Sequence, residues 1–130
     1  MTPETDSNIN MLSFIVAGAV LRDDLGIGRN FLAKIKQQVG DIPAQEQTGT
    51  VISALQKIWS CRRVDFCREA LDTLLTSLPQ QDQKPVNNLF RFSLEYIEGG
   101  RDPYFLMSLQ PDIREATKLL LSRLDPTEPL

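Results

Sequence analysis

The stretch VISALQKIWSCRRVDFCREALDTLLTSL, residues 51–78, contains two runs of apolar residues at helical spacing, separated by a pair of arginines. Apolar residues recur every three or four positions up to Trp59, as on one face of an α-helix. Arg62 and Arg63 occupy the next apolar positions, and the spacing resumes in a new phase at Val64. We therefore expect two helices that meet at the arginine pair. One long helix with a phase slip is the alternative.

The rest of the chain shows the same helical spacing, and no alternation of apolar and polar residues is long enough to predict a strand. Further helices are expected over about residues 8–22, 28–39, 85–98, 103–109 and 111–124, with residues 41–47 and 79–84 as loops. The start signals are Asp6 or Ser7, Thr48 or Thr50, Asp65, Pro85, Asp102-Pro103 and Gln110-Pro111. Short connections between helices predict an all-α fold: one compact bundle of five to seven mostly antiparallel helices, forming a single domain over residues 1–130 with frayed tails at 1–7 and 125–130.

The composition excludes many kinds of chemistry. The chain has 130 residues, 42% of them hydrophobic, and it has no histidine. Without imidazole there is no Ser-His-Asp triad, no Cys-His pair and no His-ligated zinc. The carboxylate pairs Asp23-Asp24 and Glu95/Glu98 are expected to be solvated surface charge. We therefore expect no enzyme, no cofactor and no metal site.

The two cysteines do not have the spacing of a redox or zinc motif. Cys61 and Cys67 are six residues apart, so on one helix their side chains would point to different sides. Cys67 lies on the apolar face and is expected in the core, as is Trp59. Cys61 comes after the first apolar run and directly precedes the arginine pair. The positive charges of these arginines predict a lowered pKa for its thiol.

The charge is unevenly distributed along the chain. The formal net charge is −3, yet residues 29–68 carry seven basic and three acidic side chains, a local excess of +4. Basic side chains on one surface favour contact with nucleic-acid backbone, because each can neutralise a phosphate. The candidate nucleic-acid-binding residues are Arg29, Lys34, Lys36, Lys57, Arg62, Arg63 and Arg68. The alternative is a solvated face with internal ion pairs such as Arg68–Asp72. Gly26 and Gly28 predict a plain turn, with phosphate contact as the alternative.

Two segments are more apolar than a single buried face requires. Residues 14–21 are apolar nearly all round, which is typical of a helix covered on several sides, and residues 104–107 are four consecutive apolar residues. The candidate protein-interface residues are Phe14, Ala17, Gly18, Tyr104, Phe105 and Met107. Core packing is the alternative for the second segment.

The N-terminal residues are acidic and polar, unlike the basic start of a signal peptide. The longest apolar stretch, residues 11–21, is far shorter than the roughly 20 residues that span a bilayer. We expect a cytoplasmic protein whose thiols are reduced.

The closing third of the chain runs from Asn88-Leu89-Phe90-Arg91-Phe92 through Gly99-Gly100-Arg101-Asp102 to Ile113-Arg114-Glu115-Ala116. Its rhythm resembles the helical end of large subunits of CRISPR effector complexes, and the whole chain is similar to their small subunits. This resemblance implies a helical bundle that stacks in several copies and touches DNA or RNA backbone in antiviral defence. It assigns no role to any single residue. The leading hypothesis is a non-catalytic subunit of a nucleoprotein assembly, which contacts nucleic-acid backbone through residues 29–68 and also contacts neighbouring subunits. The second hypothesis is a protein–protein adaptor or homo-oligomeric scaffold that binds no nucleic acid.

Overall fold

The computed structural model describes residues 3–127, and within them the chain forms α-helices and one short 3₁₀ turn, with no strand. The helices are α1 (Pro3–Leu21), α2 (Leu25–Gly40), α3 (Ala44–Ile58), α4 (Val64–Leu75), α5 (Gln80–Glu98), α6 (Pro103–Met107) and α7 (Pro111–Leu124), and the 3₁₀ turn η1 is Trp59–Cys61. The predicted all-α bundle is confirmed, and α7 has the predicted bounds.

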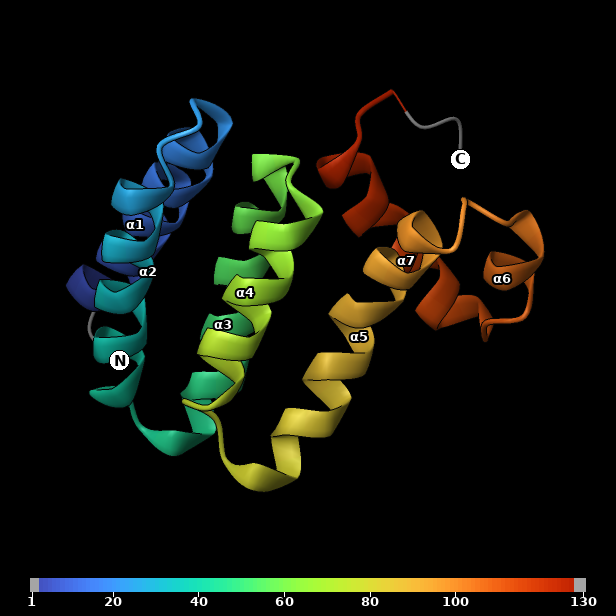
Figure 1. The fold of residues 1–130 in the computed structure, drawn as a ribbon. Coiled ribbons are helices and arrows are strands. Elements are labelled where there is room, and N and C mark those ends of the chain that lie inside the picture. Colours follow the sequence, from blue (N-terminus) through green and yellow to red (C-terminus); the bar gives the residue numbers. More distant parts are fainter. Residues whose placement is uncertain (1–2, 128–130) are drawn as a thin grey trace.

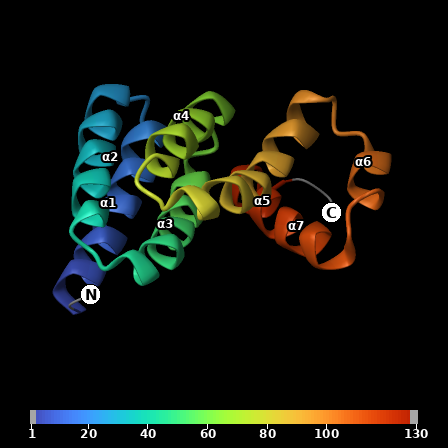
Figure 2. The ribbon, with the colours of Figure 1, turned by 90° about the horizontal axis from the view of Figure 1, so that it is seen from below.

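The helices form two parts joined along α5. Helices α1 to α4 lie as two antiparallel pairs, with α2 in front of α1 and α4 in front of α3, as Figure 1 shows. Helix α5 runs beside α4 and leads to α6 and α7 on the far side, an arrangement that is clearest from below (Figure 2). Trp59 is fully buried among α1, α3, α5 and α7, so its predicted place in the core is confirmed. A smaller cluster of Tyr96, Leu106 and Leu121 fixes α6 to α5 and α7.

The expected break between two helices is present at the arginine pair. After η1, Arg62 adopts a left-handed conformation with φ 61°, and Arg63 is extended before α4 begins at Val64. A single long helix is therefore wrong. Asp65 is not the N-cap residue either, because Arg63 holds that position and the Asp65 carboxylate accepts a hydrogen bond from the Phe66 N–H at 2.9 Å.

Helices α1 and α2 begin earlier than the sequence predicts. Helix α1 starts at Pro3, so Asp6 and Ser7 lie inside it rather than capping it or fraying. Helix α2 starts at Leu25 because the Asp24 carboxylate accepts the Ile27 N–H at 3.2 Å, which satisfies one free donor of the first turn. The ends of the predicted frayed tails, residues 1–2 and 128–130, lie outside the described residues.

Helices α3 and α5 also begin earlier, each directly after a proline. Pro43 and Pro79 both have φ −54°, a value that the proline ring sets and that leads into a helix. The threonines at 48 and 50 therefore lie inside α3 and cap nothing, and the predicted linker at residues 79–84 is mostly helix. Pro85 lies inside α5 instead of opening it, and α6 stops at Met107.

Candidate functional site

An apolar stripe remains uncovered on α1. The side chains of Met11, Phe14 and Leu21 are 54%, 61% and 51% exposed, and Gly18 lies between the last two. These positions follow one face of the helix at intervals of three or four residues. We call these four residues the α1 stripe. Ala17, which the sequence assigned to the same interface, is buried in the core and takes no part in the stripe.

The second predicted interface segment divides between surface and core. Tyr104 and Met107 on α6 are 76% and 66% exposed. Leu106 is buried, and Phe105 is half-buried with its ring centroid 6.2 Å from that of Phe92 on α5. One face of this five-residue helix therefore anchors it, and the opposite face presents two isolated apolar side chains.

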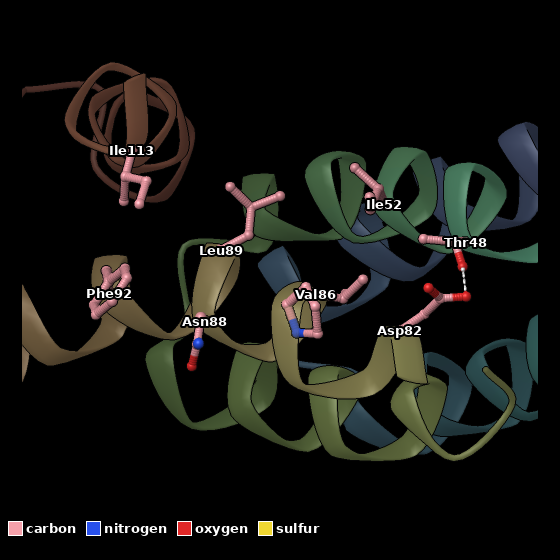
Figure 3. Close-up of a pocket in the computed structure, with 9 residues that line it drawn as sticks. Thr48, Ile52, Asp82, Val86, Asn88, Leu89, Phe92 and Ile113 are labelled. Carbon is pink, nitrogen blue, oxygen red and sulfur yellow. Dashed lines mark hydrogen bonds between the residues drawn. The ribbon is translucent and has the colours of Figure 1, made fainter. Parts of the chain in front are cut away.

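A half-open apolar groove lies between α3, α5 and α7. Its cavity measures about 440 Å³, within the range of sites that hold a ligand or a few inserted side chains. Figure 3 shows Ile113 of α7 facing Phe92 and Leu89 of α5 across the open space, with Ile52 of α3 farther along. The lining residues are Thr48, Ile52, Asp82, Pro85, Val86, Asn88, Leu89, Phe92 and Ile113. We call this the α3–α5–α7 groove.

An acidic side chain lies at one end of the groove, and a basic one lines a neighbouring hollow. At one end the Asp82 carboxylate accepts a hydrogen bond from the Thr48 hydroxyl at 3.0 Å (Figure 3). Beyond Leu89, a smaller hollow of about 130 Å³ continues between α3 and α7 and is lined by Arg123, whose guanidinium donates to the Gln56 carbonyl at 3.1 Å. The groove therefore offers a partner an apolar floor with an acidic end, and Arg123 lies in the adjoining hollow.

No family model, curated protein or solved structure matches this chain. These comparisons therefore assign no role to the surfaces described above. None of the helices in the described part of the chain is both long enough and apolar enough to cross a bilayer. Among the side chains described, those of residues 7–127, no three cysteines or carboxylates gather as ligands for a metal ion.

Most of the candidate nucleic-acid-binding residues already contact acceptors within the chain. Arg29 donates to the Glu69 carboxylate at 3.0 Å, across from α2 to α4. Arg63 bridges Asp23 at 2.9 Å and Asp65 at 3.0 Å. The contact between Arg63 and Asp65 raises the pKa of Arg63 and lowers that of Asp65, chiefly through their mutual hydrogen bond. The local basic excess seen in the sequence is thus largely balanced by acids.

The side chains of the other candidate basic residues also contact groups within the described part of the chain, with the exception of Arg62. Arg68 pairs with Glu98 of α5 rather than with Asp72, the partner named in the alternative of a solvated face with internal ion pairs. Lys36 donates to the Thr76 hydroxyl and Lys57 to the Ser53 hydroxyl, each at 2.7 Å. Lys34 lies over the Phe31 ring, 4.6 Å from its centroid. Arg62 is exposed on its left-handed turn and contacts no acid among the described residues.

The two cysteines meet at the helix junction. The predicted separation to different sides is wrong, because the break at Arg62 turns α4 back and leaves the two Sγ atoms 3.6 Å apart. The buried position of Cys67 is confirmed, and Cys61 is buried as well. The pKa of Cys61 is lowered as predicted, but mainly by a hydrogen bond from the Cys67 thiol rather than by the arginine pair.

The sequence did not reveal the α3–α5–α7 groove or the cysteine pair. The groove combines side chains from three helices, and its Asp82 lies in a segment predicted to be a loop. Met11 and Leu21 were also missed as interface residues, although their spacing from Phe14 is visible in the sequence. The signal that could have found them is the width of the apolar arc on α1, which exceeds one buried face.

Proposed function

We propose that the protein is a non-catalytic helical scaffold that associates with further copies of itself, the α1 stripe of one copy lying in the α3–α5–α7 groove of another. One observation carries this proposal. The same chain exposes three large apolar side chains along one helix face and, elsewhere, an apolar groove of about 440 Å³. Apolar surface of this kind gains free energy when another protein surface removes it from water.

The shapes of the two surfaces are complementary. The α1 stripe is a ridge with anchors at positions i, i+3 and i+10, the pattern with which an amphipathic helix enters a groove. Gly18 carries no side chain at position i+7, and the Arg22 guanidinium lies beside it, with its Nη1 atom 3.5 Å from where a Cβ would be. Burying a Phe, Leu or Met side chain fully gains about 1.5–3 kcal/mol, and these side chains are about half exposed. Three of them contribute roughly 2–5 kcal/mol, so the apolar side chains that line the groove must supply the rest of the free energy that offsets the cost of association.

The charged side chains beside the two surfaces favour one orientation of α1 in the groove of another copy. Arg22 directly follows the α1 stripe, is exposed and contacts no acid among residues 7–127, whose side chains the structure describes. Asp82 lies at the acidic end of the α3–α5–α7 groove. Placing the Arg22 end of α1 against the Asp82 end of the groove pairs these charges between copies. An assembly of several copies is also what the resemblance to CRISPR small subunits implies.

The test separates the two halves of the contact. Phe14→Lys disables the α1 stripe and leaves the groove intact, whereas Ile113→Lys disables the groove and leaves the stripe intact. Light scattering over a concentration series should show association for the wild type and a monomer for each variant alone. An equimolar mixture should recover a two-copy complex, because each variant supplies the half that the other lacks. Phe14→Ala should weaken wild-type association about tenfold, the effect of losing roughly 1.4 kcal/mol.

The control is Ile27→Lys, which places the same charge on an exposed apolar position of α2. It should associate like the wild type, and circular dichroism should show all variants folded. A wild-type protein that stays monomeric at high concentration contradicts self-association. Association of the wild type that both lysine variants retain contradicts the assignment to these surfaces.

Contact with nucleic-acid backbone is the second candidate function, and Arg62 is the observation that favours it. Its guanidinium is exposed and has no acidic partner in the described part of the chain. The neighbouring Arg63 ion pairs are at the surface, where water and salt screen the attraction between the charges. A phosphate can therefore compete for Arg63, so the acids around it do not remove this candidate.

Filter binding of a DNA or RNA oligonucleotide over a salt series tests this second candidate. If Arg62 and Arg63 each contact a phosphate, the Arg62→Ala/Arg63→Ala double variant should bind more weakly, and its slope of log affinity against log salt should be smaller by about 1.8. Arg91→Ala, which removes an exposed arginine paired with Glu95 on α5, is the matched control. Equal binding by wild type and double variant at low salt contradicts this function.

A further inference from the structure

Cys61 and Cys67 form an isolated pair of thiols on either side of the α3–α4 junction. Their Sγ atoms are 3.6 Å apart, and the Cys61 thiol also lies 3.7 Å from the Arg63 carbonyl oxygen. Both side chains are buried, and neither belongs to the α1 stripe or the α3–α5–α7 groove. In a disulfide the sulfurs are about 2.05 Å apart, so a side-chain movement of about 1.5 Å would bring this pair within bonding distance.

We propose that this pair is an oxidation site, at which a peroxide converts Cys61 and Cys67 into an intramolecular disulfide. Once one thiol has been oxidised to a sulfenic acid, a neighbouring thiol held this close can attack it before a second oxidant molecule arrives. The six-residue spacing gives no sign of this, because it matches neither a Cys-x-x-Cys motif nor a zinc site. The turn at Arg62 creates the pair, and this modification is independent of any self-association.

The chemistry balances with hydrogen peroxide as the only co-reactant. The Cys61 sulfur attacks one peroxide oxygen, the O–O bond breaks, and Cys61 becomes a sulfenic acid while its proton leaves with the departing oxygen as water. The Cys67 sulfur then attacks the Cys61 sulfur, and the sulfenic oxygen leaves with the Cys67 proton as a second water. Two thiols are oxidised by two electrons in total, and one peroxide is reduced to two waters.

The surroundings assign the two thiols different roles. The hydrogen bond that Cys61 receives from Cys67 lowers the pKa of Cys61, so Cys61 is the better nucleophile of the pair. Donating that hydrogen bond, together with burial, raises the pKa of Cys67. Cys67 therefore keeps its proton until Cys61 has been oxidised, and then resolves the sulfenic acid.

The sequence itself provides a clean assay, because trypsin cleaves after Arg62 and Arg63, between the two cysteines. Folded protein is treated with hydrogen peroxide, remaining thiols are alkylated in denaturant, and the protein is digested without reduction. We expect loss of both alkylation sites, an intact mass lower by two hydrogens, and a disulfide-linked pair of peptides 58–62 and 64–68. Reduction with dithiothreitol should restore both thiols.

The controls establish that the folded geometry is responsible. Peroxide treatment in urea should form the bond more slowly, since the unfolded chain no longer holds the sulfurs together. Cys67→Ser should leave Cys61 as a sulfenic or sulfinic acid, and Cys61→Ser should leave Cys67 largely unoxidised. Retention of both thiols in the folded protein, or bonds only between different molecules, would overturn the proposal. A rate in urea equal to the rate in the folded protein would also overturn it.

Discussion

Replacing Trp59 with alanine is expected to lower the free energy of unfolding by about 3–5 kcal/mol, the usual cost of deleting a fully buried tryptophan. The Trp59 ring is completely buried, and its centroid is 5.0 Å from that of Phe90 on α5. Its indole N–H donates to the Ser93 hydroxyl at 2.9 Å. A domain of this size has a total stability of roughly 5–15 kcal/mol, so this single change removes a large part of it. Urea denaturation with a fitted slope measures the loss.

Two further substitutions make this result interpretable. Trp59→Phe keeps an aromatic ring but removes the N–H donor, and it should cost about 1–2 kcal/mol. Tyr104→Ala removes an aromatic side chain that is exposed on α6, and it should change the unfolding free energy by less than about 0.5 kcal/mol. If Trp59→Ala costs no more than Tyr104→Ala, then Trp59 does not join α5 to the first four helices as described here.

The second large effect is expected at Gly28 of α2, which packs directly against Val20 of α1. A Cβ atom at Gly28 would lie 2.8 Å from the Val20 Cγ2 atom and 3.4 Å from the Phe66 ring. Both neighbours are buried in the core, so neither can move aside easily. Gly28→Val should therefore lower the free energy of unfolding by about 1–3 kcal/mol through overpacking, again measured by urea denaturation.

Gly49→Val is the matched control for Gly28. Gly49 also lies within a helix, but it is exposed and no atom is near its missing Cβ. The same substitution there should change stability by no more than about 0.5 kcal/mol. Equal losses at both positions would show that valine in a helix, rather than the contact with Val20, causes the effect.

The sequence predicted the fold well where apolar spacing extends through an element. The break at Arg62 was visible because the apolar face there changes phase, and α7 was delimited by Pro111 and by the end of its apolar face. The start of α5 was hidden, since residues 80–84 are polar and mostly solvent-facing and contribute no periodic signal. Proline before a helix was interpreted as a loop, although its fixed φ also prepares a helix start.

The candidate sites were predictable only in part, because they depend on contacts between distant segments. The basic residues were visible in the sequence, but the acids that balance them come from other helices, such as Glu69 for Arg29 and Glu98 for Arg68. The exposure of Phe14 follows from the apolar arc of α1. The cysteine pair depends on a single left-handed residue, Arg62, which no periodic pattern reveals.

Pro85 has a consequence for the groove whose floor it helps to form. A proline inside a helix has no N–H to donate, so the carbonyl of Gln81, four residues earlier, loses its usual partner in the helical ladder. A helix bends most easily where one of its backbone hydrogen bonds is missing. The first turn of α5, which carries Asp82, is therefore the part of the groove that can flex most easily, while Trp59 holds the later part of α5 through Phe90 and Ser93. A flexible first turn of α5 lets the α3–α5–α7 groove accept side chains of different size without rearranging the other helices.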